Sequence, residues 1–220
     1  MAEETEGLSK AIAITRFTVT GEPEEFERAF LAHSEFVRAQ PGFRQFQALR
    51  SALSAKVYVN VGWWSDLDSY QQALASPQFQ ADAQSMAALV SVEPYLTTKV
   101  ANGLAIRTEA DGEPAQGYSD ERLVVLTRYK VKGDPDAFAA EFTAHTQSRR
   151  QQDGFIFHEG VRAVNQPDTF LNLEWWMDAS AYRKAVEGEQ LRTEIAAIEQ
   201  LAGIEVDQAH NFAIGEPTGD

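Results

Sequence analysis

The chain has 220 residues, no cysteine and a formal net charge of −14 at pH 7. The absence of cysteine excludes disulfide bonds, thiolate metal sites and cysteine nucleophiles. An acidic chain with no basic stripe is a poor partner for nucleic acid or for an anionic membrane. No apolar run approaches the roughly 18 residues of a membrane span, and the acidic start is unlike a signal peptide. We therefore expect a cytoplasmic globular protein.

The N-terminal half alternates between strand-like and helix-like patterns. Short β-rich runs bounded by Gly and Pro predict strands, and phenylalanines at helical spacing predict a first helix. Gly42 is placed for a left-handed helix end, and Asp66 for the N-cap of a second helix. In chain order we predict a strand at 11–19, a helix ending near Val37, strands at about 43–50 and 56–64, a helix to about residue 90 and a strand near 91–103. This β-α-β-β-α-β order is typical of a ferredoxin-like fold.

The same pattern returns 112 positions later without a gap, so that residues 11–100 align with residues 123–212. A period this long indicates a duplicated and fused folding unit rather than a solenoid. We predict an α+β protein of two tandem ferredoxin-like domains, at 1–103 and 123–220, joined by a linker at 104–122. Their antiparallel sheets are expected to pack face to face as an intramolecular dimeric α/β barrel. The protein would then be a monomeric pseudo-dimer or a dimer of pseudo-dimers.

Alternation along the strand at 56–64 separates two sets of side chains. We interpret Val59 and its aliphatic neighbours as the contact between the two sheets. Asn60 and Trp64 would face the helices instead, and Tyr70 follows at the start of the second helix. The same three residues return in the second copy as Asn172, Trp176 and Tyr182. A polar set kept in both copies predicts one candidate cavity in each repeat.

This N-x3-W-x5-Y spacing, at a strand end before a capped helix, resembles the antibiotic biosynthesis monooxygenase family of the dimeric α/β-barrel superfamily. The resemblance covers each repeat nearly from end to end. It implies a monooxygenase that uses O2 without flavin, haem or metal, and that oxidises phenolic aromatic polyketides to quinones. In that mechanism the substrate itself supplies electrons to O2, while the protein positions the reactants and manages protons. No cofactor and no metal site are therefore expected.

The resemblance also implies roles for the repeated residues. The Asn amide and the Trp indole N–H would hold a substrate carbonyl or a peroxy intermediate, which is preorganised electrostatic stabilisation. These roles would fall on Asn60, Trp64, Asn172 and Trp176. The tyrosine of the motif would bind the oxygens of the substrate, which assigns this role to Tyr70 and Tyr182.

One departure from the family pattern concerns the anchoring of a substrate anion. Relatives often carry a basic residue further along the second helix, where this chain has Gln84 and Ala196. Arg16 and Arg128 are alternative anchors, because alternation places them on the strand face of Ile12 and Ile14. Tyr58 and Glu174, at positions where the two cavities differ, complete the predicted substrate-binding residues. A buried carboxylate at Glu174 would be either a second base with a raised pKa or a support for a neighbour.

Histidine recurs once in each copy, as His33 and His145, on the face of the first helix that carries phenylalanines. At this place it is a candidate general base that takes the phenolic proton near neutral pH. A hydrogen-bonded core histidine is the alternative interpretation. His158 and His210 have no counterpart in the first copy and are assigned no role.

Two other functions fit the same fold, namely a polyketide cyclase and a non-catalytic protein that binds an aromatic ligand. Some relatives degrade haem through a histidine on the second helix, but 75–90 and 187–201 contain none. Motifs for zinc, serine-hydrolase and Rossmann chemistry are also absent from the sequence. The expected partners are a small aromatic substrate and O2, with no nucleic acid and no membrane.

Overall fold

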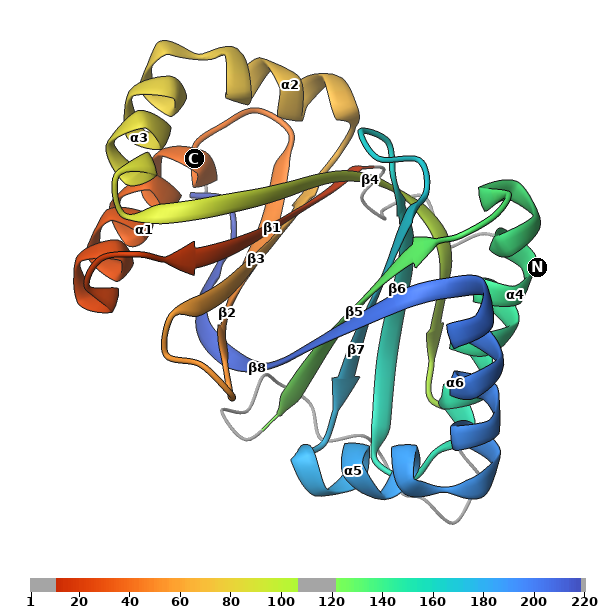
Figure 1. Ribbon diagram of the computed structural model, residues 1–220. Helices are drawn as coiled ribbons and strands as arrows, with labels where there is room; N and C mark the ends of the chain where they lie inside the picture. The colour runs from red at the N-terminus through yellow and green to blue at the C-terminus, as the bar shows by residue number, and fades with distance from the viewer. Residues whose placement is uncertain (1–10, 107–121, 219–220) are drawn as a thin grey trace. The chain divides into compact units, whose positions relative to one another are not determined.

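The computed structural model describes residues 11–106 and 122–218 (Figure 1). The chain forms two compact units, Met1–Thr98 with Phe212–Asp220, and Lys99–Asn211. Each unit therefore holds most of one repeat together with the end of the other repeat's last strand. Most of the predicted linker at 104–122 lies outside the described residues.

Both repeats follow the predicted order of elements. The first comprises β1 (Ala11–Val19), α1 (Pro23–Arg38), β2 (Phe43–Ser51), β3 (Val57–Trp64), α2 (Leu67–Ala75), α3 (Pro77–Ala87) and β4 (Val90–Leu104). The second comprises β5 (Leu123–Val131), α4 (Pro135–Ser148), the short 3₁₀ helix η2 (Arg149–Gln151), β6 (Phe155–Ala163), β7 (Thr169–Trp176), α5 (Ala179–Glu187), α6 (Glu189–Leu201) and β8 (Ala202–Gly215). The prediction of two tandem ferredoxin-like repeats is confirmed.

The strands pair antiparallel in the same way in each repeat. β1 pairs with β3 and β4, and β3 also pairs with β2. In the second repeat β5 pairs with β7 and β8, and β7 also pairs with β6. The hydrogen-bonded order of the strands in the described residues is β1-β3-β2-β8-β5-β7-β6-β4, and it is closed. This closed order confirms the prediction of a barrel.

The structure differs from the prediction in the second helix of each repeat, which is two helices. Ser76 separates α2 from α3 with an extended backbone, and its hydroxyl accepts a hydrogen bond from the backbone N–H of Phe79. The cause is Pro77, because proline disfavours the helical conformation of the residue before it. Gly188 adopts the same extended conformation between α5 and α6. In the first repeat this break allows α3 to pack beside α1.

Two glycines connect the first helix of each repeat to its next strand. Gly42 and Gly154 have φ angles of 78° and 76°, which confirms the predicted left-handed conformation. A Cβ atom on Gly42 would lie 2.4 Å from Cβ of Ser69 in α2. The start of α2 is fixed by Asp66, whose carboxylate accepts a hydrogen bond of 2.7 Å from the backbone N–H of Ser69. Glycine here therefore permits both the turn and the close approach of α2.

One face of β3 forms the core with the helices of the first repeat. Tyr58 and Trp64 belong to a buried cluster with Phe26 and Phe30 of α1. Val59 is also buried, and alternation places it on the other face of the strand. The predicted assignment of the Asn60/Trp64 set to the helix side is therefore confirmed. No helix in the described part of the chain is long and apolar enough to cross a membrane.

Candidate active site

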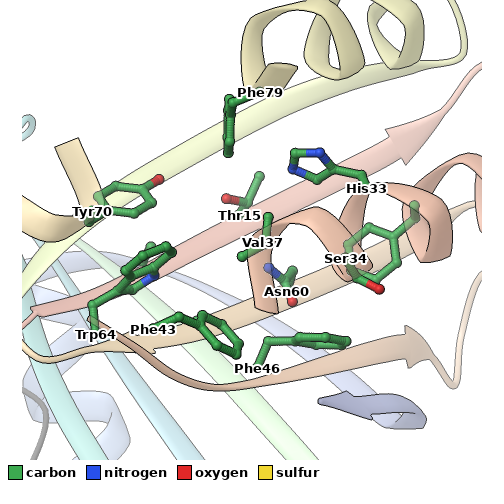
Figure 2. Close-up of a pocket in the computed structure, with 13 residues that line it drawn as sticks. Thr15, His33, Ser34, Val37, Phe43, Phe46, Asn60, Trp64, Tyr70 and Phe79 are labelled. Carbon is green, nitrogen blue, oxygen red and sulfur yellow. The ribbon is translucent and has the colours of Figure 1, made fainter. Parts of the chain in front are cut away.

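A pocket lies in the first repeat between the sheet and the helices α1, α2 and α3 (Figure 2). It contains about 80 Å³ of space that water can enter, within about 550 Å³ of atom-free space that continues into solvent. Its lining residues are Ala13, Thr15, Phe30, His33, Ser34, Val37, Phe43, Phe46, Asn60, Gly62, Trp64, Tyr70 and Phe79. A largely apolar and aromatic lining with a few polar groups is the usual composition of a small-molecule site.

Adjacent strands supply the sheet side of the pocket. Thr15 in β1 is paired directly with Asn60 in β3, so both side chains project from the same face. Gly62 and Trp64 share this face, because side chains alternate along a strand. The structure thus brings four predicted residues of the first repeat to one pocket, namely Asn60, Trp64, Tyr70 and His33.

The Asn60 amide has unused hydrogen-bonding capacity. Its Oδ1 is buried and has no hydrogen-bond partner among the residues that the structure describes. An unpaired buried polar atom costs about 1–3 kcal/mol, so such atoms in native proteins call for an explanation such as a ligand or an ordered water. Gly62 leaves room next to the Trp64 indole, since a Cβ at this glycine would lie 3.3 Å from Nε1 of Trp64, and Asn60 lines the same pocket. The amide and the indole N–H therefore border the same open space.

Aromatic rings form much of the pocket wall. The Trp64 ring meets the rings of Tyr70 and Phe43 at centroid distances of 5.3 and 5.4 Å. Such an arrangement offers ring faces and edges to a planar aromatic ligand. Burial raises the pKa of Tyr70 to about 12, so its hydroxyl stays protonated near neutral pH and can donate a hydrogen bond.

His33 enters the pocket from α1 (Figure 2). Its Nδ1 lies 3.1 Å from Oδ2 of Asp82 in α3, and its ring meets the Phe79 ring edge-on at 4.8 Å. Among the lining side chains, only His33 and Tyr70 carry a titratable group. Because Tyr70 stays protonated, His33 is the lining side chain that can serve as a general base. In residues 11–106 and 122–218, no group of three or more His, Asp or Glu side chains is arranged to hold a metal ion.

The equivalent place in the second repeat is filled. Seven lining residues are unchanged there, namely Thr127, Phe142, His145, Phe155, Asn172, Trp176 and Tyr182. However, the counterpart of Gly62 is Glu174, and the counterpart of Val37 is Arg149. Nε of Arg149 lies 3.0 Å from Oε1 of Glu174, and the two side chains are 4% and 0% exposed. A buried ion pair therefore occupies the position of the open pocket.

The Glu174 carboxylate binds to the same two groups that the family resemblance assigns to substrate. It accepts hydrogen bonds from Nδ2 of Asn172 at 2.7 Å and from Nε1 of Trp176 at 3.2 Å. Burial raises the pKa of Glu174, while Arg149 and these two donors act in the opposite direction. Burial alone would lower the pKa of Arg149, but the carboxylate beside it raises that pKa. The Glu174 carboxylate thus contacts Asn172, Trp176 and Arg149 of its own repeat.

The histidines of the second repeat also differ from His33. Nε2 of His145 lies 3.0 Å from a guanidinium nitrogen of Arg149, and burial together with this charge lowers the pKa of His145 to about 3. His158 is in hydrogen-bond contact with Oδ1 of Asn172 at 3.1 Å, and burial lowers the pKa of His158 to about 4. Neither ring takes up a proton near neutral pH. Both the oxygen and the nitrogen of the Asn172 amide therefore have a hydrogen-bond partner, whereas Oδ1 of Asn60 has none among the described residues.

Three predicted substrate-binding residues do not lie in the pocket. Arg16 is the neighbour of Thr15 and so projects from the opposite face of β1, where it forms an ion pair of 2.9 Å with Glu93. Arg128 forms the equivalent ion pair with Glu205. The hydroxyl of Tyr58 donates a hydrogen bond of 2.6 Å to Glu27. The neighbouring carboxylates, rather than a substrate anion, are the partners of these groups.

Two residues were not predicted from the sequence: Thr15, which lines the pocket, and Asp82, which lies behind His33 and contacts it. Thr15 recurs as Thr127 and shares the face of Asn60, so its repetition and alternation could have identified it. Asp82 gave no such signal, because its counterpart is Glu194 and it lies 49 positions from His33. The contact between them depends on the break before α3.

Fold and pocket together place the chain in the class of tandem ferredoxin-like α/β-barrel proteins. The family model described as antibiotic biosynthesis monooxygenase matches residues 11–84 and 122–196, one segment in each repeat. The chain belongs to this family, and it is a monooxygenase.

The chain is similar to several proteins of known name or structure. The chain is 40% identical over 85 residues to deoxynogalonate monooxygenase of Streptomyces nogalater, which covers 39% of this chain and 72% of the relative. The structure of SnoaB, a cofactor-independent oxygenase from the same organism, is 35% identical, covers 47% of this chain and 99% of that chain, and has a TM-score of 0.38. The structure of an anthrone oxidase-like protein has a TM-score of 0.77 at 11% identity, with 96% and 94% of the two chains covered, and is similar in fold.

Proposed function

We propose that the pocket of the first repeat is the active site of a cofactor-independent monooxygenase, which oxidises a phenolic aromatic polyketide with O2 to a quinone. The observation that carries this proposal is that the Glu174 carboxylate accepts hydrogen bonds from Asn172 and Trp176. It supports the idea that an Asn/Trp pair in this position binds an oxygen anion. In the first repeat the same pair, Asn60 and Trp64, borders a pocket in place of a protein carboxylate.

The reaction balances without an added reductant. At the reacting methylene of a phenolic polycyclic ketone, two C–H bonds break and one C=O bond forms. One atom of O2 becomes the carbonyl oxygen, and the other leaves as water. All four electrons come from the substrate. A substrate oxygen becomes negatively charged when the phenol or its enol loses a proton, and Asn60 and Trp64 would stabilise that charge.

The shape of the pocket supports an aromatic substrate. Rings of Phe43, Trp64 and Tyr70 surround the space next to Asn60. The name of the relative deoxynogalonate monooxygenase also favours an aromatic polyketide as the substrate class. The expected partners are thus a small aromatic molecule and O2, and the expected location is the cytoplasm.

The proposal gives one working site per chain. In the second repeat the donor pair is already bound to Glu174, and His145 is neutral against Arg149. A substrate oxygen would have to displace a buried ion pair there, which is costly because each separated charge loses its partner. We therefore assign the chemistry to Asn60, Trp64 and His33, and a structural role to Asn172, Trp176 and His145.

The test is an oxygen-electrode assay with a dihydroxyanthrone, using protein treated with a chelator and no added cofactor. The proposal predicts that one O2 is consumed for each quinone formed, and that one oxygen atom of labelled O2 appears in the product. No O2 uptake with the anthrone, together with ring closure of an uncyclised polyketide, would indicate a cyclase instead. Tight binding of the anthrone without turnover would indicate a ligand-binding protein.

A further inference from the structure

We infer that Asp82 is a positioning residue for His33, and that the two act as a carboxylate–imidazole pair that removes the phenolic proton of the substrate. This inference rests on the proposed function, because it assigns the base of that reaction. Asp82 does not line the pocket and would act only through the histidine.

The geometry of the pair fixes the orientation of the imidazole. The distance of 3.1 Å between Nδ1 of His33 and Oδ2 of Asp82 fits a hydrogen bond that the ring donates. The other carboxylate oxygen accepts a hydrogen bond of 2.7 Å from Nε2 of Gln78, so Asp82 is itself held in place. With its proton on Nδ1, the ring presents Nε2 as an acceptor. The Phe79 ring, whose centroid lies 4.8 Å from that of the imidazole, limits rotation of the imidazole.

The second repeat provides a comparison within the same chain. Glu194 is the counterpart of Asp82, and it accepts a hydrogen bond of 3.0 Å from Gln190 just as Asp82 does from Gln78. Its other carboxylate oxygen, however, accepts a hydrogen bond from the hydroxyl of Ser148. His145 faces Arg149 instead. The carboxylate–imidazole pair therefore occurs in the repeat with the open pocket, while His145 and Glu194, its counterparts in the other repeat, have other partners.

Asp82 is the charged partner of His33 in the structure. The groups that face it are Asp82 from α3 and the protonated Tyr70 from α2, while Thr15 and Asn60 on the strands are uncharged. When Nε2 takes the phenolic proton, the ring becomes positively charged and Asp82 stabilises it. The imidazolium then gives its proton to the leaving oxygen atom, one C–H proton of the methylene completes the water, and the other C–H proton restores the phenol. The histidine therefore ends the cycle as it began.

The test combines turnover with a measurement that does not require oxygen. Without O2, a bound dihydroxyanthrone that has lost its phenolic proton is detected by its red-shifted absorption. We expect Asp82→Asn to lower both kcat and the fraction of bound phenolate by about tenfold or more, with KM nearly unchanged. Asp82→Glu should restore most of the loss, since it returns a carboxylate. The matched control Glu194→Gln should keep the wild-type values.

The double variant shows whether the two residues act together. His33→Gln with Asp82→Asn should be no slower than His33→Gln alone, because Asp82 acts through the ring. The inference is overturned if Asp82→Asn leaves kcat and the phenolate fraction unchanged, or if the two losses multiply in the double variant. If the wild-type protein forms phenolate but consumes no O2, the proposed oxygenation fails while the assignment of the base is retained.

Discussion

The buried ion pair of the second repeat allows a quantitative test. Arg149→Val introduces the residue found at the equivalent position of the first repeat and leaves Glu174 charged and unpaired in a site that is 0% exposed. Breaking a buried pair on one side costs about 3–5 kcal/mol in the free energy of unfolding. Glu174→Gly removes the other partner and should cost a similar amount. Both single variants should therefore be strongly destabilised.

The double variant Arg149→Val with Glu174→Gly should be more stable than either single variant. It removes both charges and introduces the first-repeat residues at these two positions, and the open pocket of the first repeat has a volume of about 80 Å³. At about 24 cal/mol per Å³ such a cavity costs about 2 kcal/mol. Urea unfolding of the four proteins at pH 7.5 measures this cycle. If the double variant loses the sum of the two single losses, the two side chains do not stabilise each other and the reasoning is refuted.

Three further predictions concern pH, the turn and the pocket. The pKa values of His145 and His158 lie below that of an unfolded histidine, at about 3 and about 4, so the unfolded chain binds protons first as the pH falls. The free energy of unfolding should be greatest above about pH 6.5 and should fall by about 2 kcal/mol for each ring by pH 5. In His158→Phe this loss should be smaller, and urea unfolding at the two pH values measures it. Gly42→Ala should lower the melting temperature, since the residue has a φ of 78° and a Cβ there would lie 2.4 Å from Ser69; an unchanged value would contradict this. Tyr70→Phe should raise KM several-fold with little change in kcat if its hydroxyl binds the substrate, and steady-state kinetics distinguishes this from a loss of kcat.

Much of the fold follows from the sequence because its signals are local. Gly42 and Gly154, the caps at Asp66 and Asp178, and the alternation along β3 each report a backbone requirement at their own position. Gap-free repetition then extends every assignment to the second copy. The division of the second helix was missed even though Pro77 marks it, since helical spacing continues on both sides of the break.

The state of the second pocket could not be predicted in the same way. The sequence shows that Glu174 is at the position equivalent to Gly62. Whether a buried carboxylate lowers or raises the stability of the fold depends on its partner, however. That partner is Arg149, which is 25 positions away and is brought to Glu174 by the packing of η2 against β6. The repeated residues therefore indicated two candidate sites, and the structure shows that one pocket is open and the other is filled.

The most direct test of the account compares Asn60→Ala with Asn172→Ala in the same O2-uptake assay. The two residues are equivalent in the repeat, and they differ in whether the amide borders the pocket or the Glu174 carboxylate. The account predicts that Asn60→Ala lowers kcat by about 10²–10³-fold, as for the loss of one donor to an oxygen anion. It predicts that folded Asn172→Ala keeps kcat within about twofold and loses stability instead, because Glu174 loses a buried donor. Full activity of Asn60→Ala, or an equal loss of kcat in both variants, would contradict it.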